Sequence, residues 1–571
     1  MSSTSVTIGS ASVTEEVRIG LFSLYIIYVR LQPQNELKSE ALKKDDEFSD
    51  WVSSTFTTLS CIGKDIDVCS ISIVPEHLIK SNKDAYSPKI VSIGPMHRKT
   101  KRDLLYTKEA KWRSMLSLLY RNKTDEETRE ALERCMNDMH GVEEAVRANY
   151  VDDDLKLVGR YDMAKIMLLD GCFLLELLIS HDQKLNDELK CRLKPPFDQI
   201  KKKKEELLSD LVLLENQIPL LVLRYLFDAI FPGKLKEEGN EATAKRICKL
   251  VLSLFSFSFD SNSTVEFYSV HLLDLLHSFM TRELEEPKIV GATSSSRDWK
   301  IDMDKEDDAK EYEILELKRC ATKLHASGVT IEPKKNKCPG SRKNDIGINF
   351  DIKFNERKKS LKIPKLRITR TTEAKWRNFI AWEHNRCDRT QITPLMPREK
   401  KVNCKFSLYA LFIQGLICCE HDIQLLKDKG VIVVDDDVNS GINQDKEKYK
   451  EKKKKNKKKG MSNKELMIIL NNIADGVDRD KIYMDISFGK LFNKLNKHQS
   501  TRNCFTENVI LFWHWLRCFF TTSIRYKWEI SYDILKKEYT PTMWKKIGVV
   551  YACILLGLSI AQLVLKLIPA I

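Results

Sequence analysis

Apolar residues recur at helical spacing through most of the chain, and this pattern predicts a mainly α protein. Five residues before position 121 share one face of a predicted helix, because their spacing is i, i+3, i+4, i+7 and i+8. They are Trp112, Met115, Leu116, Leu119 and Tyr120. The stretch 163–180 is more apolar still, but charged residues interrupt it: Lys165, Asp170 and Glu176. Because a membrane-spanning helix seldom carries three charges, we expect a buried core helix here.

Pro219 divides a long apolar run at residues 201–231, and it should break or kink the helix that the flanking residues favour. Two further helices are expected within residues 241–282. Residues 283–310 are polar and contain the run Gly-Ala-Thr-Ser-Ser-Ser, which indicates a linker. The helical part before this linker therefore ends near residue 282.

Beyond the linker the apolar period changes from helix to strand and back. A helix is expected to end near Ala326 with Gly328 as its C-cap, and its apolar face carries Ile314, Leu317, Ala321 and Leu324. Apolar side chains then alternate between residues 348 and 363, which predicts a small β-hairpin around Asn355–Ser360. Helical spacing returns at residues 372–428, and a last helical block follows a charged insert at 434–462.

The C-terminal segment has the length and flanks of a membrane anchor. Residues 547–565 contain no charge and would form about 28 Å of helix, close to the bilayer core. Basic residues precede the segment and only uncharged ones follow Lys566, so the positive-inside rule places the large N-terminal portion in the cytosol. The membrane-flanking residues are Trp544, Lys545, Lys546 and Lys566. We expect one transmembrane helix at about 547–568, in the plasma membrane or an endomembrane.

Three segments follow from these patterns: a variable leader at 1–45, a helical domain at 46–540 and the anchor at 541–571. The apolar stretch at 19–29 in the leader is too short to span a bilayer. It lacks a small-x-small cleavage site and follows two glutamates, so a buried or surface-docked segment is favoured over a signal peptide.

Half of the formal charge of +14 lies in one lysine run. Residues 441–460 hold ten lysines against three acidic residues, with one tyrosine and no arginine. A nucleic-acid surface would interleave arginines and aromatic residues along a face, so we expect no nucleic-acid partner. A solvated, disordered loop is favoured, and contact with anionic lipid and nuclear import are the alternatives.

The fifteen cysteines contain no Cys-x-x-Cys pair, and their odd number in a long chain favours a reducing, cytosol-facing compartment. Cys418 and His421 lie three residues apart, but a structural zinc site needs four ligands, so no metal is expected. Phosphate-binding glycine loops, the zinc-protease helix motif and the hydrolase nucleophile elbow are absent from the sequence, so no cofactor is expected either.

Three carboxylates, each expected within an apolar helix, are the remaining candidates for chemistry: Asp170, Glu176 and Glu215. Such groups can form an acid–base pair, but more often they fix how helices pack by accepting hydrogen bonds or pairing with a cation. No nucleophile or phosphate cradle accompanies them, so the structural interpretation is favoured.

The loop at residues 82–98 resembles a site because it concentrates Tyr86, Pro88, Gly94, Pro95 and His97. The Gly-Pro pair is a strong turn signal, and a proline restricts the residue before it to extended backbone. His97 would need a partner to act as a base, and none is identifiable nearby in the sequence. A turn whose aromatic and imidazole groups bond into the core is therefore expected.

Several stretches, in order, resemble the plant domain-of-unknown-function 247 family, also called uncharacterised protein family 0481. They begin with the opening loop and continue through "MLLDGCFLLELL", "DLVLLENQIPLLVLRYLF", "HLLDLLHSFM", "FDIKF", "LKIPKLRI" and "WRNFIAWE". The signature residues are Pro75, Tyr86, Pro88, Gly94, Pro95, His97, Asp170, Gly171, Glu215, Asn216 and Pro219. The chain departs from the family after Pro95, where Met96, His97, Arg98 and Lys99 replace a tail with two histidines and a glycine.

The resemblance implies a membrane-associated plant protein with no established catalytic residues, and it implicates some grass members in self-incompatibility. We therefore expect a non-enzymatic protein that takes part in protein recognition or signalling, with membrane lipid and an unidentified protein as partners. An enzyme of unrecognised mechanism that uses the buried carboxylates is the alternative.

Overall fold

The computed structural model describes most of the chain between residues 70 and 516. The described ranges are 70–98, 105–121, 123–151, 153–190, 202–233, 240–257, 269–281, 316–334, 350–392, 404–434, 461–480, 486–498 and 508–513, with the single positions 55, 193, 197, 482 and 516. Within them the protein is mainly helical with small sheets, as the sequence predicts.

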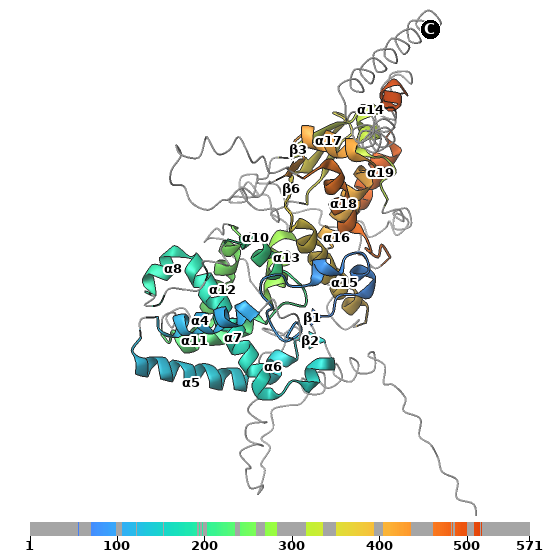
Figure 1. Cartoon of the computed structure of the whole chain (residues 1–571). Helices are drawn as coiled ribbons and strands as arrows, with labels where there is room; N and C mark the ends of the chain where they lie inside the picture. Colours follow the sequence, from blue (N-terminus) through green and yellow to red (C-terminus); the bar gives the residue numbers. More distant parts are fainter. Residues whose placement is uncertain are drawn as a thin grey trace, which may run out of the picture.

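One group of helices surrounds α7 in the lower part of Figure 1. Its members are α4 (Leu105–Leu119), α5 (Asp125–Gly141), α6 (Glu143–Arg147), α7 (Arg160–His181), α8 (Gln183–Glu188), α11 (Leu220–Ile230) and α12 (Asn240–Leu254). Almost every residue of α7 after its second turn is buried, because α4, α5, α11 and α12 all pack against it. The predicted core helix at 163–180 is thereby confirmed.

The second group lies in the upper part of Figure 1 and combines helices with short strands. Its helices are α14 (Ala321–Ala326), α15 (Thr372–Ile392), α16 (Lys405–Leu416), α17 (Glu420–Asp428), α18 (Asn463–Ala474) and α19 (Ile486–Lys497). Its strands are β3 (Thr330–Lys334), β4 (Lys353–Asn355), β5 (Ser360–Pro364), β6 (Leu366–Ile368) and β7 (Ile432–Val434).

Two small sheets organise these strands. Strand β5 is central in the order β3-β5-β4, parallel to β3 with Ile331 opposite Leu361 and antiparallel to β4 with Phe354 opposite Leu361. Strand β6 pairs in parallel with β7, with Leu366 opposite Ile432. The β4–β5 pair confirms the predicted hairpin, and β7 is a strand that the sequence pattern did not indicate.

The opening segment and two helices join the groups. They are β1 (Ile71–Ser72), α3 (Glu76–Ile79), the 3-10 helix η1 (Lys83–Tyr86), α10 (Lys204–Asp210) and α13 (Leu272–Thr281). Helices η1, α10 and α13 all pack against α15. Strand β1 pairs in parallel with β2 (Tyr150–Val151), near the 3-10 helix η3 (Asp153–Leu157). One hydrophobic core of buried residues, from Ile71 to Leu495, runs through both groups.

Two helix ends fall where the sequence predicts them. Pro219 is the N-cap of α11 and separates it from α10, so it breaks the long apolar run as expected. After α14, Gly328 has a positive φ of 95°, and Val329 N–H reaches back to Leu324 O at 3.0 Å. These contacts confirm the glycine cap at the end of this helix.

Other local predictions were wrong. Trp112 and Leu116 on the predicted apolar face are 49% and 48% exposed, although Met115 and Leu119 of the same face are buried as expected. The helix before Gly328 begins only at Ala321, so the buried Leu317 lies in a non-helical approach. Glu215 was expected in a helix but lies in the loop between α10 and α11.

Several predicted segments lie outside the described residues: the leader at 1–45 with its 19–29 stretch, the linker at 283–310, residue Ile314, most of the insert at 434–462 and the anchor at 541–571. Val434 ends β7 and Ser462 caps α18, so 435–460 is the part of that insert left undescribed. In the part of the chain that the structure describes, no helix combines the length and the apolar character that a bilayer crossing requires.

Gly171 sets the approach of α7 to α11. A Cβ atom at this position would lie 2.4 Å from Leu226 Cδ1 and 3.0 Å from Val222 Cγ1. Both contacts come from the tightly packed face of α11, so a larger residue must push the two helices apart.

We expect Gly171→Ala to destabilise the protein by about 1–3 kcal/mol through this overpacking. Gly141→Ala is the matched control, because no heavy atom lies within 4 Å of its added Cβ and the residue ends α5. Thermal unfolding of both variants checks the prediction, and equal midpoints for the two would contradict it.

Candidate functional site

The signature residues meet in a buried polar network between the opening loop, α7 and the α10–α11 loop. Its centre is Asp210, the last residue of α10. The Asp210 carboxylate accepts hydrogen bonds from three consecutive backbone N–H groups: Lys89 at 2.9 Å, Ile90 at 2.5 Å and Val91 at 2.9 Å. This carboxylate therefore satisfies the donors of a buried loop segment that has no strand partner.

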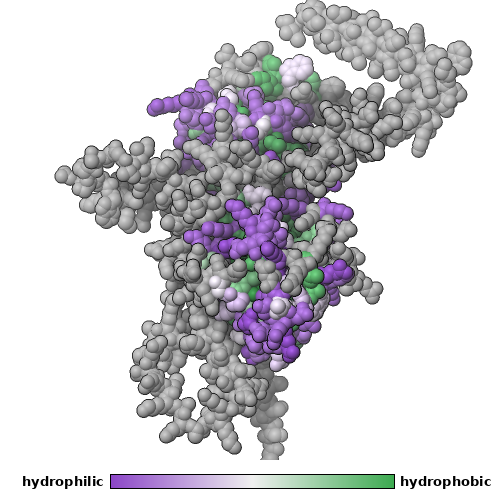
Figure 2. Space-filling model, turned by 90° about the vertical axis from the view of Figure 1, so that its left-hand side faces the viewer, coloured by the Kyte–Doolittle hydropathy of each residue, from purple (hydrophilic) through white to green (hydrophobic). Residues whose placement is uncertain are grey.

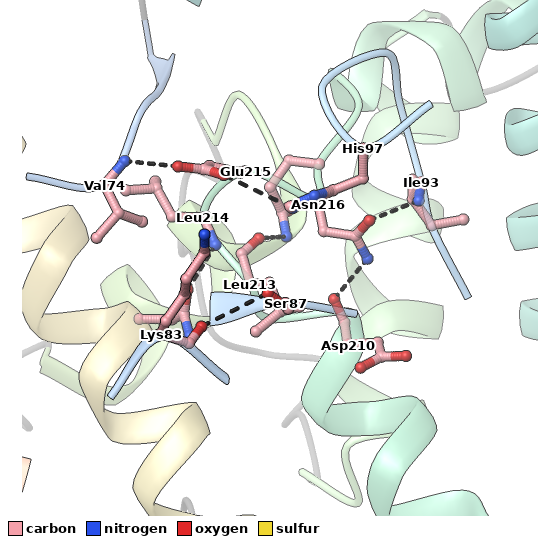
Figure 3. A network of polar contacts seen from close by, with 12 residues as sticks. Val74, Lys83, Ser87, Ile93, His97, Asp210, Leu213, Leu214, Glu215 and Asn216 are labelled. Atoms are coloured by element: carbon pink, nitrogen blue, oxygen red, sulfur yellow. Dashed lines mark hydrogen bonds and ion pairs between the residues drawn. The ribbon is translucent and has the colours of Figure 1, made fainter. Parts of the chain in front are cut away.

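Asn216 and Glu215 hold the same loop from the other side (Figure 3). The Asn216 amide accepts from Ile93 N–H at 2.6 Å and donates to the carbonyls of Val91 and Asp210 at 3.1 and 2.8 Å. Glu215 accepts from Val74 N–H at 2.8 Å through Oε1. Its Oε2 lies 3.7 Å from His97 Nε2, and Figure 3 shows the side chain between Val74 and His97.

Asp170 fixes the turn at Gly94. Gly94 N–H donates to Asp170 Oδ2 at 2.8 Å, and Lys111 Nζ lies 2.5 Å from Oδ1. Lys111 also donates to Ser92 O at 2.6 Å, so one lysine joins α4, α7 and the loop. Gly94 has a φ of +77°, and an added Cβ would lie 2.4 Å from Gln217 O. Only glycine fits this position.

The remaining signature residues shape the same loop. Pro75 is the N-cap of α3, and the residue before Pro88 has extended backbone, as a following proline requires. Arg98 N–H bonds to Pro95 O at 3.3 Å and closes the Gly-Pro turn. Tyr86 lies beneath the Arg377 guanidinium, 5.4 Å from the ring centre. The turn predicted at Gly94 and Pro95 is confirmed, whereas the contact seen for Tyr86 is this guanidinium stack.

Helix α15 adds contacts from the second group. Asn378 accepts from Leu214 N–H at 2.9 Å and donates to Ala85 O at 3.0 Å, so it joins the opening segment to the α10–α11 loop. Arg377 donates to Leu78 O, to Ser81 Oγ and to Asn472 O. The loop is therefore held by both helix groups.

Glu176 belongs to a separate buried pair on α7. Its carboxylate accepts two hydrogen bonds from the Arg121 guanidinium, both at 2.8 Å, and one from Ser117 Oγ at 2.9 Å. Both charged side chains are fully buried. Bidentate geometry of this kind is what allows an ion pair to persist in a protein interior.

Burial controls the protonation of the network. It raises the pKa of Asp210 to about 6 against the opposing effect of the three N–H donors, so the carboxyl is mainly ionised at pH 7. It raises the pKa of Asp170 as well, against the Lys111 ammonium. It lowers the pKa of His97 to about 4, so this imidazole is neutral at pH 7. The contact between His97 and Glu215 is therefore not an ion pair.

The arrangement leaves little room for a substrate among the described residues. Asp170, Glu176 and Glu215 each accept hydrogen bonds from groups of the chain itself. A cavity of about 10 Å³ adjoins Ile93, Asn216 and Gln217. This volume admits about one water molecule. These contacts indicate that the network stabilises the folded conformation of the chain.

Comparison with known proteins shows to which family the chain belongs. The sequence matches DUF247, described as plant protein of unknown function, over residues 71–558. The chain belongs to this family. It is 24% identical over 375 residues to UPF0481 protein At3g47200 of Arabidopsis thaliana, which covers 64% of this chain and 68% of that one. It is 27% identical over 234 residues to the putative UPF0481 protein At3g02645 of the same plant, which covers 39% and 40% of the two chains. No solved structure matches it.

Within this DUF247 protein, several members of the network were not predicted from the sequence. Asp210, Lys111, Arg121 and Asn378 are distant in sequence from the groups that they bind, by 121, 19, 55 and 293 residues. Asp210 and Asn378 lie in stretches that carry the family resemblance. Their polar side chains in apolar surroundings could have indicated a role in the network.

The Cys418–His421 stretch also gains a distant neighbour. Sulfur atoms of Cys320 and Cys418 and a carboxylate oxygen of Asp422 lie within 4.8 Å of one another. Cys320 is almost one hundred residues upstream, so spacing alone could not supply it. The group therefore combines Cys418 with Cys320 and Asp422, and His421 is not part of it.

We expect Glu176→Gln to destabilise the protein by about 3–5 kcal/mol, because it leaves the buried Arg121 charge without its counterion. The matched control is Glu133→Gln, which removes the exposed pair with Arg129 and should cost less than about 1 kcal/mol. Urea unfolding measures both. A Glu176→Gln protein that unfolds like the wild type would contradict a structural role for this carboxylate.

Asp210 and His97 should give opposite pH dependences. Folding raises the pKa of Asp210 from 3.8 to about 6, so the folded chain binds this proton more strongly and stability falls as pH rises through that interval. Folding lowers the pKa of His97 from 6.5 to about 4, so the unfolded chain binds that proton more strongly and stability rises with pH.

His97→Gln should therefore decrease, and Asp210→Asn increase, the slope of the unfolding free energy against pH, each by up to about 1.4 kcal/mol per pH unit. Urea unfolding at several pH values between about 4 and 6.5 provides the slopes. Changes of the same sign in both variants would contradict these assignments.

Proposed function

We propose that this DUF247 protein is a non-enzymatic recognition protein, with its helical domain on the cytosolic side of a plasma membrane or endomembrane and its C-terminal segment as the anchor. The helical domain binds another protein. No cofactor or nucleic acid takes part in this role. Two observations support the proposal. The buried carboxylates of the domain are bonded to groups of the chain itself, and aromatic side chains are exposed on its surface.

The observation that carries the proposal is an exposed aromatic surface on α4 and α7, defined by Trp112, Leu116, Tyr161 and Lys165. Trp112 and Leu116 are half exposed one helical turn apart, and Tyr161 is 79% exposed. Lys165 Nζ lies 5.9 Å from the Trp112 ring centre, and it stands one turn after Tyr161. Tryptophan and tyrosine are the side chains that most often dominate binding at protein interfaces.

On the face drawn in Figure 2, hydrophilic residues prevail over the described surface and hydrophobic ones form small, separate groups. A soluble surface of that kind does not require a tryptophan and a leucine side by side on one helix face. The polar groups with catalytic potential meanwhile hold backbone in the buried network, which supports recognition over chemistry.

The membrane part rests on the sequence of residues 547–565 and its flanks. An uncharged stretch of this length matches the bilayer core, and Lys545 and Lys546 precede it. The basic flank favours a cytosolic location for everything before it.

Proximity labelling in the tissue that expresses the protein tests both parts. The full chain should label a set of proteins that the double variant Trp112→Asp, Leu116→Asp fails to label. The variant Ile468→Asp changes an equally exposed residue on α18 and should keep that set.

Truncation before Lys545 should move the protein from the membrane to the soluble fraction. An unchanged set in the double variant overturns the recognition surface, and persistent sedimentation of the truncated chain overturns the anchor.

A further inference from the structure

Three cysteines and an aspartate come together where α14 meets α17. Cys320 is the residue before α14, and Cys418 and Cys419 precede α17. Helices α14 and α17 pack against each other, which brings the two chain segments together from about one hundred residues apart. Cys320 is buried, Cys419 is half buried and Cys418 is exposed, so the group opens to the surface at Cys418.

The carboxylate of Asp422 is the fixed point of this group. Its Oδ1 accepts from Thr322 N–H at 2.8 Å and from Thr322 Oγ1 at 2.7 Å. Its Oδ2 accepts from the N–H groups of Cys418 and Cys419 at 3.0 and 3.3 Å. Asp422 is fully buried, and donors from both segments hold it in one orientation.

The sulfur atoms surround Oδ2 of this carboxylate. The Cys418 thiol donates to Asp422 Oδ2 at 3.0 Å, and hydrogen bonds join it to the thiols of Cys320 and Cys419. The ligand atoms of Cys320, Cys418 and Asp422 all lie within 4.8 Å of one another. Two thiolates on one tetrahedral zinc ion, each at about 2.3 Å, lie about 3.8 Å apart. The group is therefore close to the spacing that a tetrahedral ion needs.

We propose that Cys320, Cys418 and Asp422 bind one Zn²⁺ ion, with solvent at the fourth position. Two thiolates and a carboxylate are a donor set that zinc accepts, and the exposed side at Cys418 leaves the fourth position open to water. Binding releases the thiol protons of Cys320 and Cys418 to solvent. The ion then occupies the place of the proton that Cys418 now shares with Asp422 Oδ2.

The ion would tie together two helix–strand units of the second group. Helix α14 leads into β3, and α17 leads into β7. Because β3 and β7 belong to different sheets, the ion adds a link that no strand pairing provides. Zinc should therefore stabilise the folded chain by mass action as well as bind to it.

Zinc binding by the reduced full-length protein tests the proposal. Titration of Zn²⁺ against a fluorescent chelator gives the number of ions bound, and Co²⁺ in place of Zn²⁺ gives a thiolate charge-transfer absorption. We expect Cys418→Ser and Cys320→Ser each to lose one equivalent of Zn²⁺ relative to the wild type, together with that absorption. Cys419→Ser is the control from the same turn and should keep both.

Cys418 is exposed, so Cys418→Ser should fold even if the buried Cys320→Ser does not, and circular dichroism checks this. Zinc should raise the midpoint of thermal unfolding of the wild type and of Cys419→Ser, but not that of Cys418→Ser. Equal zinc stoichiometry in wild type and Cys418→Ser overturns the proposal. Loss of the same equivalent in Cys419→Ser overturns the ligand assignment, and so does a Cys320–Cys418 disulfide that persists under reductant.

Discussion

The whole arrangement depends on one requirement, which is that the buried backbone of the opening loop must find hydrogen-bond partners without forming a strand. Three successive N–H groups at residues 89–91 converge on the Asp210 carboxylate. Asn216 and Asp170 take the next donors at Ile93 and Gly94. An unsatisfied buried N–H costs on the order of 1–3 kcal/mol, so side chains from α7 and the α10–α11 loop are needed to keep this loop inside the protein. The 3-10 helix η1 of this loop in turn packs against α15.

In this chain, the residues that carry the family resemblance around the opening loop thus have structural roles. Gly94 allows the turn because it adopts a positive φ, and Asp170 and Asn216 accept hydrogen bonds from the buried backbone of the opening loop. A catalytic interpretation would require such groups to face a cavity, whereas these face backbone. The recognition that we propose involves residues outside the signature, on the aromatic surface of α4 and α7.

The sequence predicted local features well where a single residue decides them. Pro219 ends one helix and begins another because it lacks an N–H, and Gly328 caps a helix because it tolerates positive φ. The predicted apolar face of α4 included the exposed Trp112 and Leu116 because they fit the helical period as well as the buried Met115 and Leu119 do. The partners of Glu176 and the neighbour of Cys418 were unpredictable, since folding brings them from 55 and about one hundred residues away.

The bond from Asn378 to Ala85 O spans 293 residues, and this distance affects how the chain is made. At about 5–20 residues per second, a ribosome needs roughly 15–60 s to travel from one partner to the other. During that interval the opening loop has been synthesised but α15 has not, so its carbonyl must be hydrated or shielded by another molecule. The loop that organises the finished protein is therefore made early, but its contacts are completed only after the chain has grown as far as α15.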